Sequence, residues 1–352
     1  MNIKEIAGLA GVSPATVSRV LNGSGYVKKD TKKRVMEAVE KHNYVPNAIA
    51  RSLSVQESSE IGLVIPGLRG DFFADLAEGV LEEAAFCGQH VVIMKTDHRK
   101  DLEETALERL GEQRLKGIIL VPGEEIEYET DCETGKETVS ETKIPQRITE
   151  LEKTGISVVL AGRTLKGIRM DRVCADEAEA VYEAAEELIK NGYEKLMLLG
   201  RKIKNPEEKE KVQAFYRAGE ENRCDLKKNF LSFAVSGREE AEERTEAALK
   251  GKTPVRALIV TDPELGMGCI KALKKAGKEG EVPIVMPGDA EQLLTLELPV
   301  ASIGLNGREQ GREAVRLLLN RFENRETGCT IGKRVVVPCD LQFWKKKKPA
   351  SV

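Results

Sequence analysis

The sequence predicts an all-helical head followed by a larger α/β core of two doubly wound parallel-sheet subdomains. The first 45 residues carry closely spaced helix start and stop signals, whereas short apolar runs alternate with amphipathic stretches beyond residue 59. At 352 residues, the chain also exceeds the ~250–300 residues at which single cores stop growing. We therefore expect a head at 1–45, a hinge helix and linker at 46–58, and a core at 59–352.

The first helix of the head is predicted by its capping signals. Asn2 and Glu5 have the spacing of a capping box, in which each side chain bonds to the other residue's backbone. The helix ends near Gly11, and the residues on its apolar face are Ile3, Ile6 and Ala10.

A second helix follows after a very short turn. Ser13 can cap it, and Pro14 suits the first helical position because that position needs no N–H donor. The helix ends around Asn22 and Gly23, and its inward residues are Val17, Val20 and Leu21. A third helix is expected over residues 30–43, with Val35 and Val39 inward.

Two helices joined by a glycine turn are typical of a helix-turn-helix, whose second helix enters the DNA major groove. The residues left on the outer face of this second helix are Pro14, Ala15, Ser18 and Arg19. Arg19 could donate two hydrogen bonds to guanine, while the hydroxyls of Ser13, Thr16 and Ser18 suit phosphate oxygens. Periodicity alone is equally compatible with ordinary exposed positions on a small helical domain.

The charge is unevenly distributed along the chain. Residues 1–55 contain nine Lys or Arg against four Asp or Glu, whereas the remainder contains 46 against 54. A basic head favours a polyanionic partner, although ordinary solvated surfaces also produce such a difference. Residues 47–53, which follow Pro46, could form a helix too short to be stable alone, so we expect it to order only when something packs on it.

Seven apolar runs predict the strands of the core, and helices separate them. The runs are IGLVIP (61–66), HVVIMK (90–95), GIILVP (117–122), SVVLAG (157–162), KLMLLG (195–200), ALIVTD (257–262) and PIVMPG (283–288). Continuous apolar strands of this kind form parallel sheets covered on both faces, and their number favours two subdomains in tandem. The acidic stretch 124–143 is interpreted as a solvated surface insertion.

Several classes of protein are disfavoured. The seven cysteines include no CxxC pair, and no signal peptide or membrane span is apparent, so we expect a cytoplasmic protein without a membrane partner. A periplasmic receptor would have no use for the N-terminal helices.

The three histidines, His42, His90 and His98, lack metal-site spacing, and no phosphate loop, dinucleotide fingerprint or nucleophile elbow occurs. We therefore expect no enzyme, metal or cofactor. A protein-interaction module is a third alternative, which a shallow salt dependence of binding would distinguish from a DNA-binding protein.

The runs NIKEIAGLAGVSPATVSRVLNG and VKKDTKKRVMEAVEKHNYVPNAIARSL closely resemble the opening motif of the LacI/GalR family of bacterial repressors, over residues 2–53. The resemblance implies a homodimeric repressor that binds a palindromic double-stranded DNA operator. It places Pro14, Ala15 and Arg19 at base-reading positions. The phosphate-facing positions that it implies are Ser13, Thr16, Ser18, Asn22, Tyr26 and Thr31. This chain departs from the family at Lys28, where a serine or similar cap usually begins the third helix.

The resemblance also explains the short segment at 47–53. In this family, hinge helices from two subunits pack together in the minor groove, where a leucine pair opens a central base step. The matching residue is Leu53, with Ala50 beside it. An apolar wedge of this kind bends the duplex and widens the contact surface. A simpler alternative is that Leu53 anchors a linker to the core.

The core resembles that of periplasmic sugar-binding proteins, whose two lobes close on a ligand at the carboxyl ends of strands. The candidate ligand residues are Phe72, Phe73, Asp97, Arg163, Lys211, Thr261, Asp262 and Asp289. Sugar-responsive relatives usually carry Asp, Arg and Asn where this chain carries Gly162, Lys211 and Thr261, and an Asp near Gly288, where this chain carries Gly288-Asp289. Because lysine does not reproduce arginine's bidentate geometry, ordinary sugar recognition is in doubt. A different small-molecule effector is preferred, ahead of a pocket controlled by a protein co-regulator or a repressor without an effector.

Overall fold

The structure is a computed structural model that divides into two compact units, Met1–Ser58 and Ser59–Val352. It describes residues 2–22, 26–42, 44, 59–113, 115–123, 128–130, 137–139, 143–163, 165, 169–203, 206–226, 230–294, 299–323 and 332–343. The hinge predicted at 46–58, with Ala50 and Leu53, lies outside the described residues.

The head contains three helices, α1 (Ile3–Ala10), α2 (Pro14–Asn22) and α3 (Lys29–Lys41). The predicted capping box is present at α1. The Asn2 side chain accepts hydrogen bonds from the N–H groups of Lys4 and Glu5 at 3.0 and 3.1 Å, and the Glu5 carboxylate accepts one from Asn2 N–H at 2.9 Å. Gly11 ends the helix with φ of 61°, a left-handed conformation that glycine adopts at little cost, so α2 can begin after a tight turn.

The core of the head is formed where these three helices meet. Its buried residues are Ile6, Ala7, Ala10, Val17, Val20 and Val35. The predicted inward positions of α1 and α2 are therefore confirmed, and Leu21 packs against this core while half-buried.

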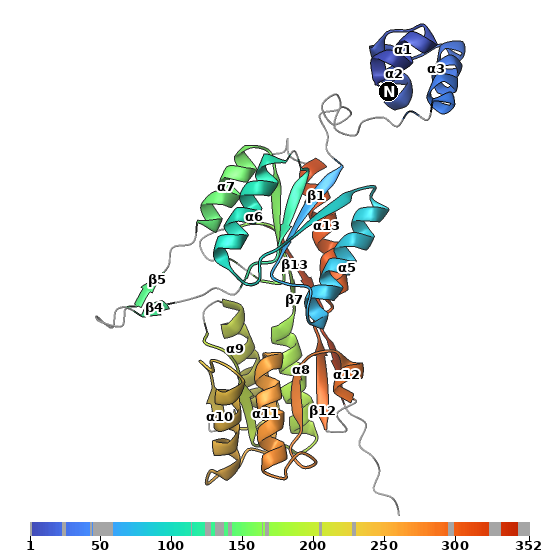
Figure 1. Ribbon diagram of the computed structural model, residues 1–352. Helices are drawn as coiled ribbons and strands as arrows, with labels where there is room; N and C mark the ends of the chain where they lie inside the picture. The colour runs from blue at the N-terminus through green and yellow to red at the C-terminus, as the bar shows by residue number, and fades with distance from the viewer. Residues whose placement is uncertain are drawn as a thin grey trace, which may run out of the picture. The chain divides into compact units, whose positions relative to one another are not determined.

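The first lobe of the core contains a six-stranded parallel sheet in the order β13-β7-β6-β3-β1-β2. Helices α5 and α13 cover one face, and α6 and α7 cover the other (Figure 1). Its elements are β1 (Glu60–Ile65), α5 (Asp71–Phe86), β2 (His90–Lys95), α6 (Lys100–Glu112), β3 (Gly117–Leu120), α7 (Ile144–Lys153), β6 (Ser157–Ala161), β7 (Arg172–Ala175), α13 (Gly307–Glu323) and β13 (Arg334–Val337).

The second lobe contains a six-stranded sheet in the order β14-β12-β11-β10-β8-β9, parallel except for β14. Helices α8 and α9 pack on one face, and α10 and α11 on the other. Its elements are α8 (Glu177–Lys190), β8 (Leu196–Leu199), α9 (Pro206–Glu221), β9 (Phe230–Ser232), α10 (Arg238–Lys250), β10 (Ala257–Val260), α11 (Pro263–Lys275), β11 (Ile284–Pro287), α12 (Ala290–Leu294), β12 (Val300–Gly304) and β14 (Asp340–Gln342).

The two predicted α/β subdomains are present, and each of the seven predicted runs contains a strand. They are not simply consecutive, however, and this corrects the tandem arrangement. The chain enters the second lobe after β7, returns to the first through α13 and β13, and crosses again to β14 (Figure 1). The C-terminal segment is thus shared between the two lobes. Its helix α13 packs apolar residues onto the core of the first lobe, beside α5.

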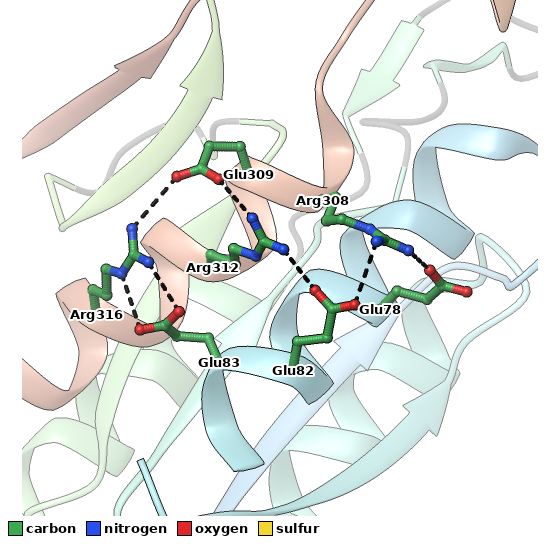
Figure 2. A network of polar contacts seen from close by, with 7 residues as sticks. All are labelled: Glu78, Glu82, Glu83, Arg308, Glu309, Arg312 and Arg316. Atoms are coloured by element: carbon green, nitrogen blue, oxygen red, sulfur yellow. Dashed lines mark hydrogen bonds and ion pairs between the residues drawn. The ribbon is translucent and has the colours of Figure 1, made fainter. Parts of the chain in front are cut away.

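Helix α13 is held to α5 by close backbone packing and by a network of ion pairs. A side chain at Gly79 or Gly311 would collide with the backbone of the facing helix. Figure 2 shows the ion pairs that cross between the helices, including a bidentate contact of Arg316 with Glu83 at 3.0 and 3.0 Å. Other ion pairs between the described residues of α5 and α13 join Arg308 to Glu78 and Glu82, and Arg312 to Glu82. These contacts fix the returning segment on the first lobe.

The predicted acidic insertion contains a separate two-stranded antiparallel sheet of β4 (Tyr128–Thr130) and β5 (Glu137–Val139). These strands pair with each other and belong to neither large sheet. Within the parts of the chain described above, no helix combines the length and apolarity needed to cross a bilayer.

Candidate DNA-binding face and ligand cavity

Helix α2 presents an exposed face opposite its buried residues. Pro14, Ala15 and Arg19 are exposed, while Val17 and Val20 are buried in the head. Pro14 occupies the first helical position, as predicted. Because the side chains at the start of the face are small, the helix can approach a surface closely there, with one guanidinium available further along.

The Ser13 hydroxyl caps α2 and is hydrogen-bonded to the Thr16 hydroxyl. Ser13 Oγ accepts a hydrogen bond from Thr16 N–H at 3.2 Å, and the two side-chain oxygens lie 2.9 Å apart. Only one of the two hydroxyl hydrogens is needed for the bond between these oxygens. The other can be donated outward, which is the chemistry that a phosphate oxygen requires.

The other predicted phosphate positions lie on α2, between α2 and α3, and in the first turn of α3. Asn22 is the last residue of α2, and Ser18 is half-buried within it. Tyr26 is 92% exposed, and Thr31 is half-buried near the start of α3. Lys28 is the N-cap residue of α3, and its side chain makes no capping hydrogen bond. The replacement of the usual serine by lysine at this position therefore leaves α3 without a side-chain cap.

A cavity of about 260 Å³ is lined by residues of both lobes of the core. Six of the eight predicted ligand residues meet there. They are Phe72, Phe73, Arg163, Lys211, Thr261 and Asp262. The rule that ligands bind beyond the carboxyl ends of parallel strands explains why residues from separate strands converge at this point.

Two predicted ligand residues are not brought to this cavity, among the residues that the structure describes. Asp97 pairs with Lys95, with 2.5 Å between Oδ1 and Nζ. Asp289 accepts a hydrogen bond from Gln292 N–H at 2.9 Å and so caps α12. Both residues do follow a strand, as predicted. Each carboxylate, however, bonds to a residue close to it in the chain.

The Phe72 ring lies against the backbone of Gly162, the residue that follows β6. A Cβ built on Gly162 would lie 3.1 Å from the Phe72 ring, and Gly162 has φ of 77°, which disfavours other residues. The ring also contacts Phe73 in an edge arrangement, with 5.5 Å between centroids. Both phenylalanines pack against the first lobe's core, so they stabilise that lobe in addition to lining the cavity.

Lys211 lies in the cavity wall between two carboxylates. Its Nζ is 2.6 Å from Glu177 Oε2 and 3.0 Å from Glu208 Oε1, and only 6% of its side chain is exposed. Burial by itself would lower the pKa of Lys211, but the two carboxylates outweigh burial and raise this pKa above its ordinary value. The lysine therefore remains a cation that the protein itself already neutralises.

Asp262 is also engaged by the protein. Its Oδ1 accepts hydrogen bonds from the N–H groups of Glu264 and Leu265 at 2.9 and 3.1 Å, which caps α11. Its Oδ2 accepts one from Arg201 Nε at 2.7 Å. The carboxylate thus positions Arg201 in the wall and stabilises a helix start.

Two ion pairs across the lobes were not found from the sequence. Arg172 of β7 lies 3.1 Å from Glu207 of α9, and Arg334 of β13 lies 3.4 Å from Glu210 of the same helix. Each joins residues far apart in the chain, so no local spacing could reveal them. They link the first lobe's sheet to the helix that carries Lys211.

The described residues form a three-helix head with an exposed α2 face and a two-lobed α/β core with a cavity, which is the architecture of DNA-binding transcriptional regulators. Residues 2–47 match the family described as bacterial regulatory proteins, lacI family. Residues 138–345 match the periplasmic binding proteins and sugar binding domain of LacI family.

Full-length relatives agree with these matches. Catabolite control protein A of Priestia megaterium is 27% identical over 330 residues, 93% of this chain and 94% of that protein. The HTH-type transcriptional repressor PurR of Aliivibrio salmonicida is 26% identical over 326 residues, 92% of each. The fold matches that of the Lac repressor dimer bound to operator and the anti-inducer ONPF, with a TM-score of 0.73 and 18% identity over 97% of each chain.

The chain belongs to the LacI family. It is a DNA-binding transcriptional regulator of this family of repressors, and it is not an enzyme. The resemblance stated from the opening motif is confirmed.

Proposed function

We propose that this protein is a cytoplasmic repressor that binds an approximately palindromic operator as a homodimer, with an affinity set by a small ligand in the core cavity. The observation that supports this best is the exposed face of α2, where Pro14, Ala15 and Arg19 lie opposite the buried Val17 and Val20. A face of this shape fits the major groove, which admits one α-helix.

In this proposal, Arg19 donates two hydrogen bonds to guanine, and Pro14 and Ala15 contact base edges by close approach. The phosphate contacts are made by Ser13, Thr16, Ser18, Asn22, Tyr26 and Thr31. The Ser13–Thr16 pair supports this division because one hydroxyl hydrogen is left for an outside acceptor. Phosphate contacts orient the head, and base contacts select the sequence.

Dimerisation follows from the form of the target. Two-fold protein symmetry matches two half-sites of a palindrome, and the similar Lac repressor was solved as a dimer on its operator. The pair of hinge segments would then place Ala50 and Leu53 in the minor groove, where Leu53 acts as a wedge. Ligand binding closes the two lobes on each other. This closure changes the distance between the two hinge segments of the dimer, and so the affinity for operator.

The effector is most simply a small molecule other than the sugars that the family usually binds. Gly162 leaves room for the Phe72 ring rather than for a sugar-binding aspartate. Lys211 forms ion pairs with Glu177 and Glu208, so its ammonium group does not take over the ligand contact that arginine makes in sugar-responsive relatives.

Replacing Arg19 with alanine should reduce discrimination at one base pair of each half-site by about 1–3 kcal/mol, because a bidentate guanine contact is lost. The measurement is fluorescence anisotropy on the operator recovered by genomic selection and on its single-base variants. Lys33→Ala is the matched control, since it removes an exposed head charge on α3 and leaves α2 intact. An unchanged base preference in Arg19→Ala would reassign Arg19 to the DNA backbone.

Replacing Leu53 with alanine should weaken binding to the operator far more than binding to random DNA, because the wedge acts only where the central base step opens. Competition titrations with both DNAs measure the two affinities. Val55→Ala serves as a control for removing an apolar side chain from the same segment. Equal losses on operator and random DNA would eliminate the wedge.

A further inference from the structure

Gln310 is a buried amide in the wall of the ligand cavity. It lies in the first turn of α13, its side chain is fully buried, and it lines the cavity together with Leu305. It follows the carboxyl end of β12 (Val300–Gly304), a strand that is not among the seven predicted runs, on the segment that returns from the second lobe to the first.

The orientation of this amide follows from its one hydrogen bond. Gln310 Nε2 donates to the backbone carbonyl of Leu305 at 2.6 Å. A carbonyl can only accept, so the nitrogen must face Leu305 and the oxygen must face away from it. Gln310 Oε1 is buried and has no hydrogen-bond partner among the residues that the structure describes.

Buried acceptors in folded proteins nearly always have a donor. An acceptor without one is costly, and a group that donates to it gains the difference. Gln310 is a lining residue of the cavity, so a molecule bound there that reaches Oε1 can supply the donor that the described protein groups do not. The geometry therefore selects for an O–H or N–H group at this point.

The site is held firmly at the crossing between the lobes. The Gln310 backbone N–H donates to Asn306 O at 3.0 Å, and Asn306 Nδ2 donates to Pro338 O at 2.7 Å. These bonds tie the crossing before α13 to the crossing before β14. A ligand that bonds to Gln310 thus bonds to the part of the chain that connects the lobes.

The charges of the cavity wall disfavour an anion. Five basic and six acidic residues line it, within the described part of the chain. The basic groups already contact carboxylates in three cases, Lys211 with Glu177 and Glu208, Arg201 with Asp262, and Arg334 with Glu210. A phosphate or carboxylate that bound to these three groups would have to compete with their carboxylate partners.

We propose that Gln310 is a specificity-determining residue whose Oε1 accepts a hydrogen bond from a hydroxyl or amino group of an uncharged or cationic small molecule, and that the cavity rejects phosphate esters and carboxylates. This rests on the proposed function, in which the cavity holds the effector. It adds a chemical class for that effector and a contact from the helix that follows β12.

The test combines crystal structures with binding measurements on the full chain. Crystals are soaked separately in glycerol and in sodium phosphate. We expect a glycerol hydroxyl or an ordered water within hydrogen-bond distance of Gln310 Oε1, and no phosphate in the cavity. A protein donor on Oε1, or a phosphate ion held by the wall, overturns the proposal even when no other compound is found to bind.

Calorimetry then uses named probes, D-ribose, D-glucose, myo-inositol, D-glucosamine and D-glucose 6-phosphate. For any of these that binds the wild type, Gln310→Met should raise the dissociation constant about 10- to 100-fold, since the donor loses its acceptor. Gln292→Met is the matched control, because that amide donates to Asp71 at 2.9 Å and does not line the cavity. Equal affinity of wild type and Gln310→Met, or binding of the phosphate ester alone, contradicts the proposal.

Operator binding is measured on the same samples to separate the two claims. If the wild-type protein binds no DNA sequence specifically, the proposed function is wrong, whatever the cavity binds. A wild type that binds operator while Gln310 Oε1 bonds to a protein donor removes only the role of Gln310.

Discussion

Replacing Lys211 with methionine should lower the free energy of unfolding of the core by about 2–4 kcal/mol, one of the two largest effects that we expect. Methionine keeps the apolar stem but leaves Glu177 and Glu208 facing each other without the cation between them. We place the effect below that of a fully buried pair because the two carboxylate side chains are 31% and 22% exposed. Urea denaturation at pH 7 measures it.

The pH dependence gives this prediction a distinctive sign. The folded pKa of Lys211 is raised above its ordinary value of 10.5, so the stabilisation is fully present below that pH. It is lost as the pH rises above that value, because the unfolded lysine then loses its proton first. The difference between wild type and Lys211→Met should be constant from pH 7 to 9 and smaller at pH 11.

Lys209→Met is the matched control, since Lys209 is an exposed lysine on the same helix. We expect this variant to unfold as the wild type does, because exposed lysines contribute little. Equal stabilities of Lys211→Met and Lys209→Met would show that the charge cluster in the cavity wall is not a structural element.

Replacing Ile6 with alanine should abolish operator binding by unfolding the head. Ile6 is fully buried among the three head helices, and truncation of such a residue costs about 2–5 kcal/mol. A core this small rarely supplies more than about 3–5 kcal/mol in total. Hydrogen exchange of the peptides covering α1 to α3, measured on the full chain, should therefore become fast.

Leu9→Ala is the control for this variant, because Leu9 is on the same helix and is 55% exposed. It removes the same number of carbon atoms without opening a cavity, so head protection and DNA binding should persist. The urea midpoint of the core should be unchanged in both variants, since the head and core are separate compact units. Operator binding by an Ile6→Ala protein with a fully protected head would contradict this account of the head.

Local signals made the head largely predictable. The capping box of Asn2 and Glu5 and the Ser13-Pro14 start each act within one turn of helix, and the structure contains both. The seven apolar runs likewise became strands because buried parallel strands need continuous apolar sequence. In these cases, the residues that determine the structure are adjacent in the chain.

The returning segment was not predictable in this way. Strand β13 pairs with β7 from more than a hundred residues earlier, and β14 reverses direction beside β12. Such short strands carry little signal of their own and are completed by distant partners. The tandem interpretation was wrong for this reason.

The cavity shows the same division. Phe72, Arg163, Thr261 and Asp262 follow strands, and all four line the cavity. Asp97 and Asp289 also follow strands, but a position in sequence does not reveal which neighbour a carboxylate bonds to. Gln310 was missed because it follows β12, a strand that none of the seven predicted runs contains.

Selection of bound fragments from the host genome tests the central claim most directly. Full-length protein is equilibrated with sheared genomic DNA and excess random competitor at moderate ionic strength, with and without candidate metabolites, and the retained fragments are sequenced. We predict enrichment of a small set of fragments that share two half-sites related by two-fold symmetry. Retention of all fragments in proportion to their abundance would contradict sequence-specific recognition by the head.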